Sequence, residues 1–331
     1  MASNWSTDEI QDLSGSTIVV TGANSGLGYE ASKEFARKGG HVVMACRSID
    51  RGENAAEEIR EELPSASLSV HECDLADLDS IRSFAEEFSS TYSSLHILCN
   101  NAGVMAIPRS ETEQGFETQF GVNHLGHFAL TGLLLDSLIE TGGETRIVTQ
   151  SSMIHENGEI DFEDLNSEES YDEWGAYGQS KLANLLFSYE LDRRLRAADL
   201  DVTSVGCHPG YAATNLQRRG PEMSGSRLRL FAMGAANRVL AQGADTGALP
   251  LLYAATAPDV EGGQYVGPGG FRKMRGAPEL QRSSDGSYDR ENARRLWEIS
   301  EELTGVTYEF DRSLGAQAGG FASDLAARWS G

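Results

Sequence analysis

The sequence predicts an α/β fold in which a doubly wound, Rossmann-type parallel sheet carries helices on both faces. Short apolar segments alternate with amphipathic ones from residue 17 to residue 205, a glycine-rich segment follows the first apolar run, and glycine is abundant, with 36 among 331 residues. Strands that alternate with helices favour a parallel sheet covered on both sides. Right-handed crossovers then place ligands at the carboxyl ends of the strands.

The elements follow from hydrophobic periodicity. We expect strands at 17–21, 41–45, 67–71, 95–98, 146–150 and 201–205. Helices are expected at 27–38, at 48–63, and at 78–88, where Ile81, Phe84 and Phe88 share one face. A single domain is expected over 14–310, with a C-terminal extension at 311–331. Two segments interrupt the alternation: 153–175 is acidic and polar, and 211–243 contains an apolar run at 228–233 that could form a helix beside the site.

The charge balance excludes several classes of partner. Fifty acidic residues face 27 basic ones, giving a formal net charge of -23. Such a surface disfavours nucleic acid and anionic membranes, and it stays solvated in concentrated salt, which predicts a halophilic enzyme. An acidic mesophilic enzyme is the alternative. With no apolar stretch of the ~18–20 residues that span a membrane and no signal-peptide pattern, we expect a cytoplasmic protein.

The cysteines and histidines do not predict a metal site. The four cysteines lack the spacing of metal ligands and lie at strand-like apolar runs, so we expect small buried residues in a reducing compartment. His124 and His127 are expected to pack in the helix after Asn123. His155 is either a loop residue or a group at the substrate mouth.

A glycine-rich loop follows the first predicted strand. Its glycines sit where a strand turns into a helix; glycine permits positive φ there and lets backbone N–H groups approach a phosphate. The helix that begins near Gly26 offers its N-terminal amides to the same anion, and the flanking strand and helix supply the context that this motif needs. We therefore expect a dinucleotide pyrophosphate here, although an ordinary glycine turn is the alternative. The residues concerned are Gly22, Asn24, Ser25, Gly26, Leu27 and Gly28.

The end of the second strand predicts the cofactor. NAD-specific folds usually carry an acidic residue about 20 positions after the glycines, where it binds the ribose 2′-hydroxyl. This chain has Arg47 there, directly after Cys46. A guanidinium can bind a 2′-phosphate through charge-assisted hydrogen bonds, so we predict NADP(H) over NAD(H). A solvated arginine at a strand end is the alternative.

Tyr177 and Lys181 form the candidate acid/base pair. They are four residues apart, so on a helix they share one face. Tyrosine ordinarily ionises near pH 10, and a nearby ammonium favours the phenolate, so we expect the pKa of Tyr177 to fall by about two or three pH units. Tyr177 would exchange a proton with a carbonyl or alcohol oxygen, which Ser152 would orient by a hydrogen bond. A surface pair on an exposed helix is the alternative.

The motifs together resemble the short-chain dehydrogenase/reductase family. They are Thr-Gly-Ala-Asn-Ser-Gly-Leu-Gly at 21–28, Asn-Asn-Ala-Gly at 100–103, Asn-His-Leu-Gly at 123–126, Ser151-Ser152, and Tyr-Gly-Gln-Ser-Lys at 177–181, and the likeness runs over roughly 14–270. The stretches 161–166 and 174–177 are similar to the branch that contains retinol dehydrogenases, WW-domain oxidoreductase and protochlorophyllide reductase.

The resemblance implies further roles. Lys181 would also hold the nicotinamide ribose, and Asn123 would anchor a water that relays protons to Lys181. Asp74 would contact the adenine, although it could instead cap the next helix. The remaining cofactor contacts would come from Leu75, Asn101, Ala102, Gly103, Pro209, Gly210 and Thr214. The Pro209-Gly210 pair could also be a simple turn.

We therefore expect an NADP(H)-dependent oxidoreductase acting on a small carbonyl or alcohol, with a hydrophobic substrate favoured by the apolar run at 228–233. An NADPH-binding regulator without turnover is one alternative. A sugar-nucleotide epimerase or dehydratase on the same fold is another, disfavoured because those relatives usually space their glycines as Gly-x-x-Gly-x-x-Gly. The acidic surface does not exclude a homo-oligomer, which family members often form through the helices after Asn123 and around Tyr177.

Overall fold

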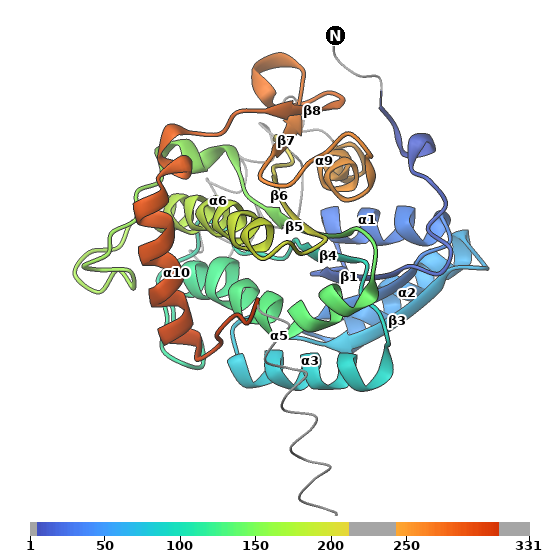
Figure 1. The fold of residues 1–331 in the computed structure, drawn as a ribbon, viewed down its shortest axis with the longest axis horizontal. Coiled ribbons are helices and arrows are strands. Elements are labelled where there is room, and N and C mark those ends of the chain that lie inside the picture. The colour runs from blue at the N-terminus through green and yellow to red at the C-terminus, as the bar shows by residue number, and fades with distance from the viewer. Residues whose placement is uncertain (1–4, 212–242, 311–331) are drawn as a thin grey trace, which may run out of the picture.

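The computed structural model describes residues 5–211 and 243–310 and contains an eight-stranded sheet (Figure 1). The strand order is β3-β2-β1-β4-β5-β6-β7-β8, parallel except for the antiparallel pairing of β8 with β7. The strands are β1 Thr17–Thr21, β2 His41–Cys46, β3 Ser67–Glu72, β4 Ile97–Asn100, β5 Thr145–Gln150, β6 Val202–Cys207, β7 Tyr265–Pro268 and β8 Pro278–Gln281. The prediction of a doubly wound parallel sheet with helices on both faces is confirmed.

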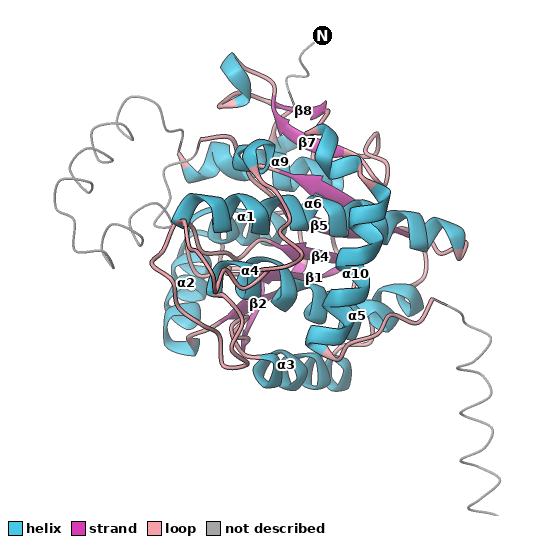
Figure 2. Cartoon of the chain, turned by 90° about the vertical axis from the view of Figure 1, so that its left-hand side faces the viewer, coloured by secondary structure: helices cyan, strands magenta, loops and turns pink. Residues whose placement is uncertain are grey.

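Helices cover both faces of this sheet (Figures 1 and 2). In Figure 1, α1 and α9 lie above the central strands, and α3 and α5 lie below them. The helices are α1 Gly26–Arg37, α2 Ile49–Glu62, α3 Leu78–Thr91, the single turn α4 Thr118–Phe120, α5 Gly126–Thr141, α6 Glu173–Ala197, α9 Ala244–Thr256 and α10 Arg290–Thr304. A π-helical turn, Gly121–Leu125, joins α4 to α5.

Alternation along the strands builds one apolar core on each face. In β1, Ile18 and Val20 pack in the cluster that includes side chains of α1, α2 and α9, whereas Val19 packs in the cluster of α3, α5 and α6. Because successive side chains of a strand point to opposite faces, a strand buried on both faces reads as a continuous apolar run. That is why the sequence located the central strands.

Helix α10 covers the outer side of α5 and α6. Trp297 of α10 packs 5.1 Å from Phe128 of α5 and 5.8 Å from Phe187 of α6, measured between ring centroids. Tyr308, just beyond α10, completes the aromatic group at 4.5 Å from Trp297. Part of the helix pair that we considered for a homo-oligomer contact is therefore covered by this chain itself.

The C-terminal third was not predicted as elements. Strands β7 and β8 have four residues each, too few to show a clear periodic pattern. Helix α9 contains Pro250 in its interior, which argues against a helix when the sequence is read alone. The predicted apolar helix at 228–233, Thr214 and the extension at 311–331 lie outside the described residues. The predicted span of the domain stays a prediction; Trp5 and Ile10, which precede it, pack in the core beside α9.

All four cysteines are buried, as expected from the strand-like runs at which they lie, and none is bonded to another cysteine. Among residues 5–211 and 243–310, no helix combines the length and apolarity that crossing a bilayer requires.

Candidate functional site

A pocket lies at the carboxyl ends of β1, β2, β3 and β4, where the strand order reverses between β1 and β4. In open α/β sheets this switch point is where ligands bind. Eleven of the predicted cofactor residues line the pocket: Gly22, Asn24, Ser25, Gly26, Leu27, Arg47, Asp74, Leu75, Asn101, Ala102 and Gly103. The other lining residues, which sequence reasoning missed, are Thr21, Ala45, Arg51, Cys73, Ala76, Val104, Thr118 and Val122.

The glycine loop has the backbone geometry expected of an anion-binding turn. Gly22 and Gly26 have φ of 66° and 57°, in the left-handed region that favours glycine. Gly28 does not line the pocket but lies beneath it: a Cβ there would meet the carbonyl oxygen of Gly22 at 2.5 Å and Nδ2 of Asn101 at 2.6 Å. Close packing of α1 against the loop therefore requires glycine at position 28.

The first turn of α1 is open to an anion. The N-cap residue Ser25 makes no side-chain hydrogen bond to the helix, although the first backbone N–H groups of a helix have no partner within it. Ser25, Gly26 and Leu27 all face the pocket. A pyrophosphate would accept these hydrogen bonds and meet the positive end of the helix dipole.

Two arginines stand at the pocket beyond the end of β2. Arg47 follows β2 directly, and Arg51 lies in the first turn of α2; both are exposed and both line the pocket. Sequence reasoning identified Arg47 and missed Arg51, although their separation of four residues at a helix start is a signal that they share a side. An exposed guanidinium pair is a ready partner for a phosphate.

Asp74 is a pocket residue and not the cap of the next helix. Helix α3 begins at Leu78 and is capped by Asp77, whose carboxylate accepts from the backbone N–H of Asp79, so the helix-cap alternative for Asp74 is wrong. Oδ1 of Asp74 accepts from the backbone N–H of Ala76 at 3.0 Å. That contact orders the turn after β3 that lines the pocket.

Asn123 joins the end of the pocket to α6. Its Oδ1 accepts from the backbone N–H of Val104 at 2.8 Å, and its Nδ2 donates to the carbonyl oxygen of Val104 and to Oγ of Ser180, both at 2.9 Å. Its own carbonyl oxygen accepts from Nδ1 of His127 at 3.0 Å. A Cβ at Gly103 would fall 2.9 Å from Oδ1 of Asn123 and 3.5 Å from Nζ of Lys181, so the pocket borders both residues.

Tyr177, Lys181 and Ser152 are brought together beside the pocket; none of the three lines it, and Lys181 approaches it at Gly103. Tyr177 and Lys181 are 4% and 3% exposed, which excludes the surface-pair alternative. Nζ of Lys181 lies 5.8 Å from the centroid of the Tyr177 ring and donates to the carbonyl oxygen of Gln150 at 3.2 Å. The hydroxyl of Tyr177 hydrogen-bonds with Ser152.

The expected lowering of the Tyr177 pKa is wrong for the protein by itself. Burial raises the pKa of Tyr177 to about 12, and the hydrogen bond with Ser152 only partly opposes this. Burial also lowers the pKa of Lys181 to about 8. Both changes have one physical cause, since a site that excludes water disfavours the phenolate and the ammonium alike.

Two segments flank the acid/base pair. His155 is buried, with Nδ1 donating to the carbonyl oxygen of Ser152 at 2.6 Å and Nε2 accepting from the backbone N–H of Ser284 at 3.1 Å, so both of its ring nitrogens are used to hold the segment around Ser152. Pro209 and Gly210 follow β6; Gly210 has φ of 68° and lies against the carbonyl of Met274.

The residues present fit a dinucleotide. The start of α1 offers backbone donors, Gly28 and Gly103 each leave space that a side chain would fill, and two arginines line the pocket. These features suit the phosphates of such a cofactor. Among the described residues that line the pocket, Asp74 is the single acid.

Comparison with known proteins places this arrangement in a family. The family model that describes short chain dehydrogenases matches residues 16–224. Retinol dehydrogenase 14 of Mus musculus is 42% identical over 308 residues, covering 89% of this chain and 87% of that protein. Retinol dehydrogenase 13 of Homo sapiens is 41% identical over 297 residues, covering 89% and 86%.

Solved structures agree. The crystal structure of an uncharacterized protein from Mycobacterium Paratuberculosis superposes with a TM-score of 0.76 at 40% identity, over 93% of this chain and 100% of that one. A protein from Beutenbergia cavernae, solved with bound NADP at low occupancy, gives a TM-score of 0.56 at 26% identity, over 74% and 91%. The chain therefore belongs to the short-chain dehydrogenase family and is an NAD(P)-dependent oxidoreductase that acts on alcohol or carbonyl groups.

Proposed function

We propose that this chain is an NADPH-dependent reductase of apolar carbonyl compounds in which Tyr177 donates the proton. The observation that carries the proposal is the group formed by Ser152 and the buried Tyr177 and Lys181, in which Lys181 approaches the dinucleotide pocket at Gly103. A regulator that only sensed the cofactor would need the pocket but not this group.

The choice of NADPH rests on Arg47 and Arg51. Both guanidinium groups stand at the pocket beyond β2, where a ribose 2′-phosphate would add about two negative charges. An NAD-specific site usually places an acid at this point, and this chain has none there. The Beutenbergia cavernae protein with bound NADP supports the same choice.

The chain's own residues supply the proton and orient the oxygen. A bound NADPH supplies the hydride that the carbonyl carbon receives. Tyr177, with its pKa raised to about 12, is protonated at neutral pH and gives its proton to the carbonyl oxygen. The hydroxyl of Ser152 donates a hydrogen bond to that oxygen and holds it in line with Tyr177. The ammonium of Lys181 stabilises the phenolate left behind. The phenolate then regains a proton from solvent.

The same pKa values keep Tyr177 in the form from which reduction starts. Oxidation needs the phenolate of Tyr177 as a base, and burial makes the phenolate scarce in the protein by itself. Reduction needs the protonated phenol, which burial maintains at neutral pH. A high pKa also weakens Tyr177 as an acid, and the ammonium of Lys181, 5.8 Å from the ring centroid, compensates as charge develops on the phenol oxygen.

The substrate class follows from one exposed aromatic residue. Trp174, in the first turn of α6, is 48% exposed and lies 6.2 Å from the ring centroid of Tyr177 at an interplanar angle of 77°. Large aromatic side chains are usually buried, so an exposed indole beside the acid/base residue suits contact with an apolar substrate. Retinol, the alcohol in the names of the mammalian relatives, is itself apolar and supports this class.

A carbonyl panel tests the proposal. The full-length protein is mixed with NADPH in molar KCl, and loss of cofactor absorbance is followed with aliphatic, aromatic and terpenoid aldehydes and ketones and with sugar-derived carbonyls. We expect turnover with the apolar carbonyls and a preference over the polar ones. Tight NADPH binding without turnover on any carbonyl would contradict the proposal and leave the regulator as the better account.

A further inference from the structure

Three segments of the chain meet at Gln119 in α4. This side chain is fully buried, and its Oε1 accepts from the backbone N–H of Ala106 at 2.7 Å. Its Nε2 donates to the hydroxyl of Tyr171 and to the carbonyl oxygen of Glu173, both at 2.9 Å. Glu173 is the first residue of α6, one turn before Tyr177. One amide therefore connects the segment after β4, the helix that leads to Asn123, and the start of the helix that carries Tyr177.

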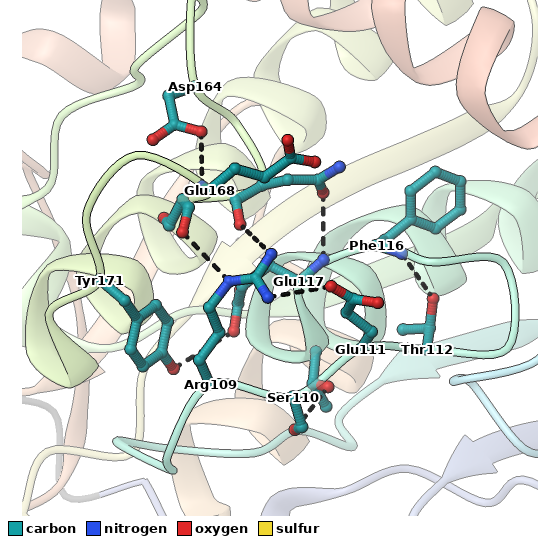
Figure 3. Close-up of polar contacts among 12 residues, drawn as sticks. Arg109, Ser110, Glu111, Thr112, Phe116, Glu117, Asp164, Glu168 and Tyr171 are labelled. Atoms are coloured by element: carbon teal, nitrogen blue, oxygen red, sulfur yellow. Dashed lines mark hydrogen bonds and ion pairs between the residues drawn. The ribbon is translucent and has the colours of Figure 1, made fainter.

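Glu117 and Tyr171 complete the connection. The carboxylate of Glu117, 1% exposed, accepts from the backbone N–H groups of Gln119 at 2.9 Å and Phe120 at 2.7 Å, which caps α4. The hydroxyl of Tyr171 lies 3.3 Å from Oε1 of Glu117 and donates to the carbonyl oxygen of Ile107 at 2.7 Å. Figure 3 shows Tyr171, from the segment before α6, and Glu117, from the segment before α4, reaching toward each other.

Further hydrogen bonds join the segment before α4 to the segment before α6. Arg109 donates to the carbonyl oxygens of Ser167 and Asn166, and the backbone N–H of Glu117 donates to Oδ1 of Asn166 (Figure 3). Ala106 has φ of 47°, a conformation that costs roughly 1–2 kcal/mol for a residue other than glycine. The hydrogen bond from its N–H to Gln119 helps to hold that conformation.

We propose that Glu117, Gln119 and Tyr171, here called the latch, are positioning residues that set the place of Tyr177 relative to Asn123 and the end of the pocket. The proposal rests on the proposed function, since it assigns these residues a part in the same reaction. None of the three latch residues lines the pocket, although Thr118 between two of them does. The latch acts through the first turn of α6 and the start of the turn that contains Asn123. Buried polar groups that are all hydrogen-bonded hold a structure in one arrangement.

Removing the hydroxyl of Tyr171 tests the latch. Tyr171→Phe leaves the carbonyl oxygen of Ile107 without its donor and Nε2 of Gln119 with one acceptor fewer. Displacement of a catalytic group by about 1 Å can cost 100-fold in rate, and we expect kcat for carbonyl reduction to fall about 10-fold. The affinity for NADPH should stay unchanged, because Tyr171 does not line the pocket.

Tyr308→Phe is the matched control. It also removes a hydroxyl that donates to a backbone carbonyl, that of Phe128 at 2.6 Å, but this hydroxyl is more deeply buried than that of Tyr171 and lies on the α10 side of the molecule. Tyr308→Phe should therefore lose at least as much thermal stability as Tyr171→Phe, whereas only Tyr171→Phe should lower kcat. Hydrogen exchange of the amides at 173–177, measured on the same samples, should rise in Tyr171→Phe and not in Tyr308→Phe.

A second variant gives a pH signature. In Gln119→Glu, the ionised side chain would place a carboxylate oxygen against the carbonyl of Glu173 and near Glu117, whereas the protonated side chain could donate as the amide does. The activity of this variant, divided by that of the wild type at the same pH, should therefore rise as the pH falls. The ratio removes the pH dependence that both proteins share through Lys181. Wild-type turnover together with unchanged kcat and unchanged exchange in Tyr171→Phe would overturn the latch alone. A wild type that turns over no carbonyl would overturn the proposed function and the catalytic role of the latch together.

Discussion

Replacing Arg47 by serine should weaken the binding of NADPH but not that of NADH. A hydrogen bond to a charged group contributes about 1.5–3 kcal/mol, and an exposed ion pair contributes about 0.2–1 kcal/mol. Arg47 is exposed at the pocket, so we place its contribution to NADPH binding between these two ranges, at about 1.4 kcal/mol. Its loss then corresponds to a tenfold rise in the Kd for NADPH. Arg51→Ser should have a similar effect, and the two will not be strictly additive, because both would contact one phosphate.

The control is Arg60→Ser in the same helix. Arg60 is also a cation of α2, but it donates to the carbonyl oxygen of Leu68 and does not line the pocket. Titration of protein fluorescence with NADPH and with NADH, at 0.1 M and 1 M KCl, measures the four dissociation constants for each variant. The effect of Arg47→Ser on the Kd for NADPH should shrink at 1 M KCl. At that concentration dissolved ions screen the attraction between exposed charges that are more than about 3 Å apart. Equal losses of NADPH and NADH affinity, or a wild type that prefers NADH, would refute the reasoning.

Three further outcomes can be measured. Gly28→Ala should lower the free energy of unfolding by about 1–3 kcal/mol and abolish NADPH binding, because its Cβ would meet the Gly22 carbonyl at 2.5 Å, whereas Gly286→Ala, with open space around it, should be neutral in melting and titration experiments. The kcat for reduction should decline as the pH rises through about 8, since the ammonium of Lys181 is present below that pKa and lost above it; Lys181→Arg should remove this decline from the pH profile. The net charge of -23 predicts a higher melting temperature in molar KCl than in dilute buffer, and equal melting temperatures would remove the halophilic interpretation.

The parts of the site that the sequence predicted well are contiguous in the chain. The loop at 21–28 and the pair Tyr177 and Lys181 each belong to one strand-to-helix turn or one helix face, so spacing alone locates them. Arg47 was found for the same reason, because it directly follows an apolar strand. Arg51 was missed because its place at the pocket depends on the direction in which α2 leaves β2.

What the sequence could not predict depends on packing between distant segments. The spacing of Tyr177 and Lys181 indicated a charge interaction, but the direction of the Tyr177 pKa is decided by burial, to which neighbouring elements contribute. Gln119 and Tyr171 are 52 residues apart, and neither belongs to a motif, so their contact could not be read from the sequence. The face of α5 and α6 covered by Trp297 was hidden for the same reason.

Transfer of a labelled hydrogen tests the central claim most directly. The wild type and Tyr177→Phe are incubated with an apolar aldehyde and NADPH in which both C4 hydrogens are deuterium, and the alcohol product is analysed by mass spectrometry. General acid catalysis contributes about 100- to 10,000-fold, so Tyr177→Phe should bind NADPH as the wild type does and form deuterated alcohol slower by that factor. Deuterated alcohol formed by Tyr177→Phe at the wild-type rate, or alcohol without the label from the wild type, would contradict the account.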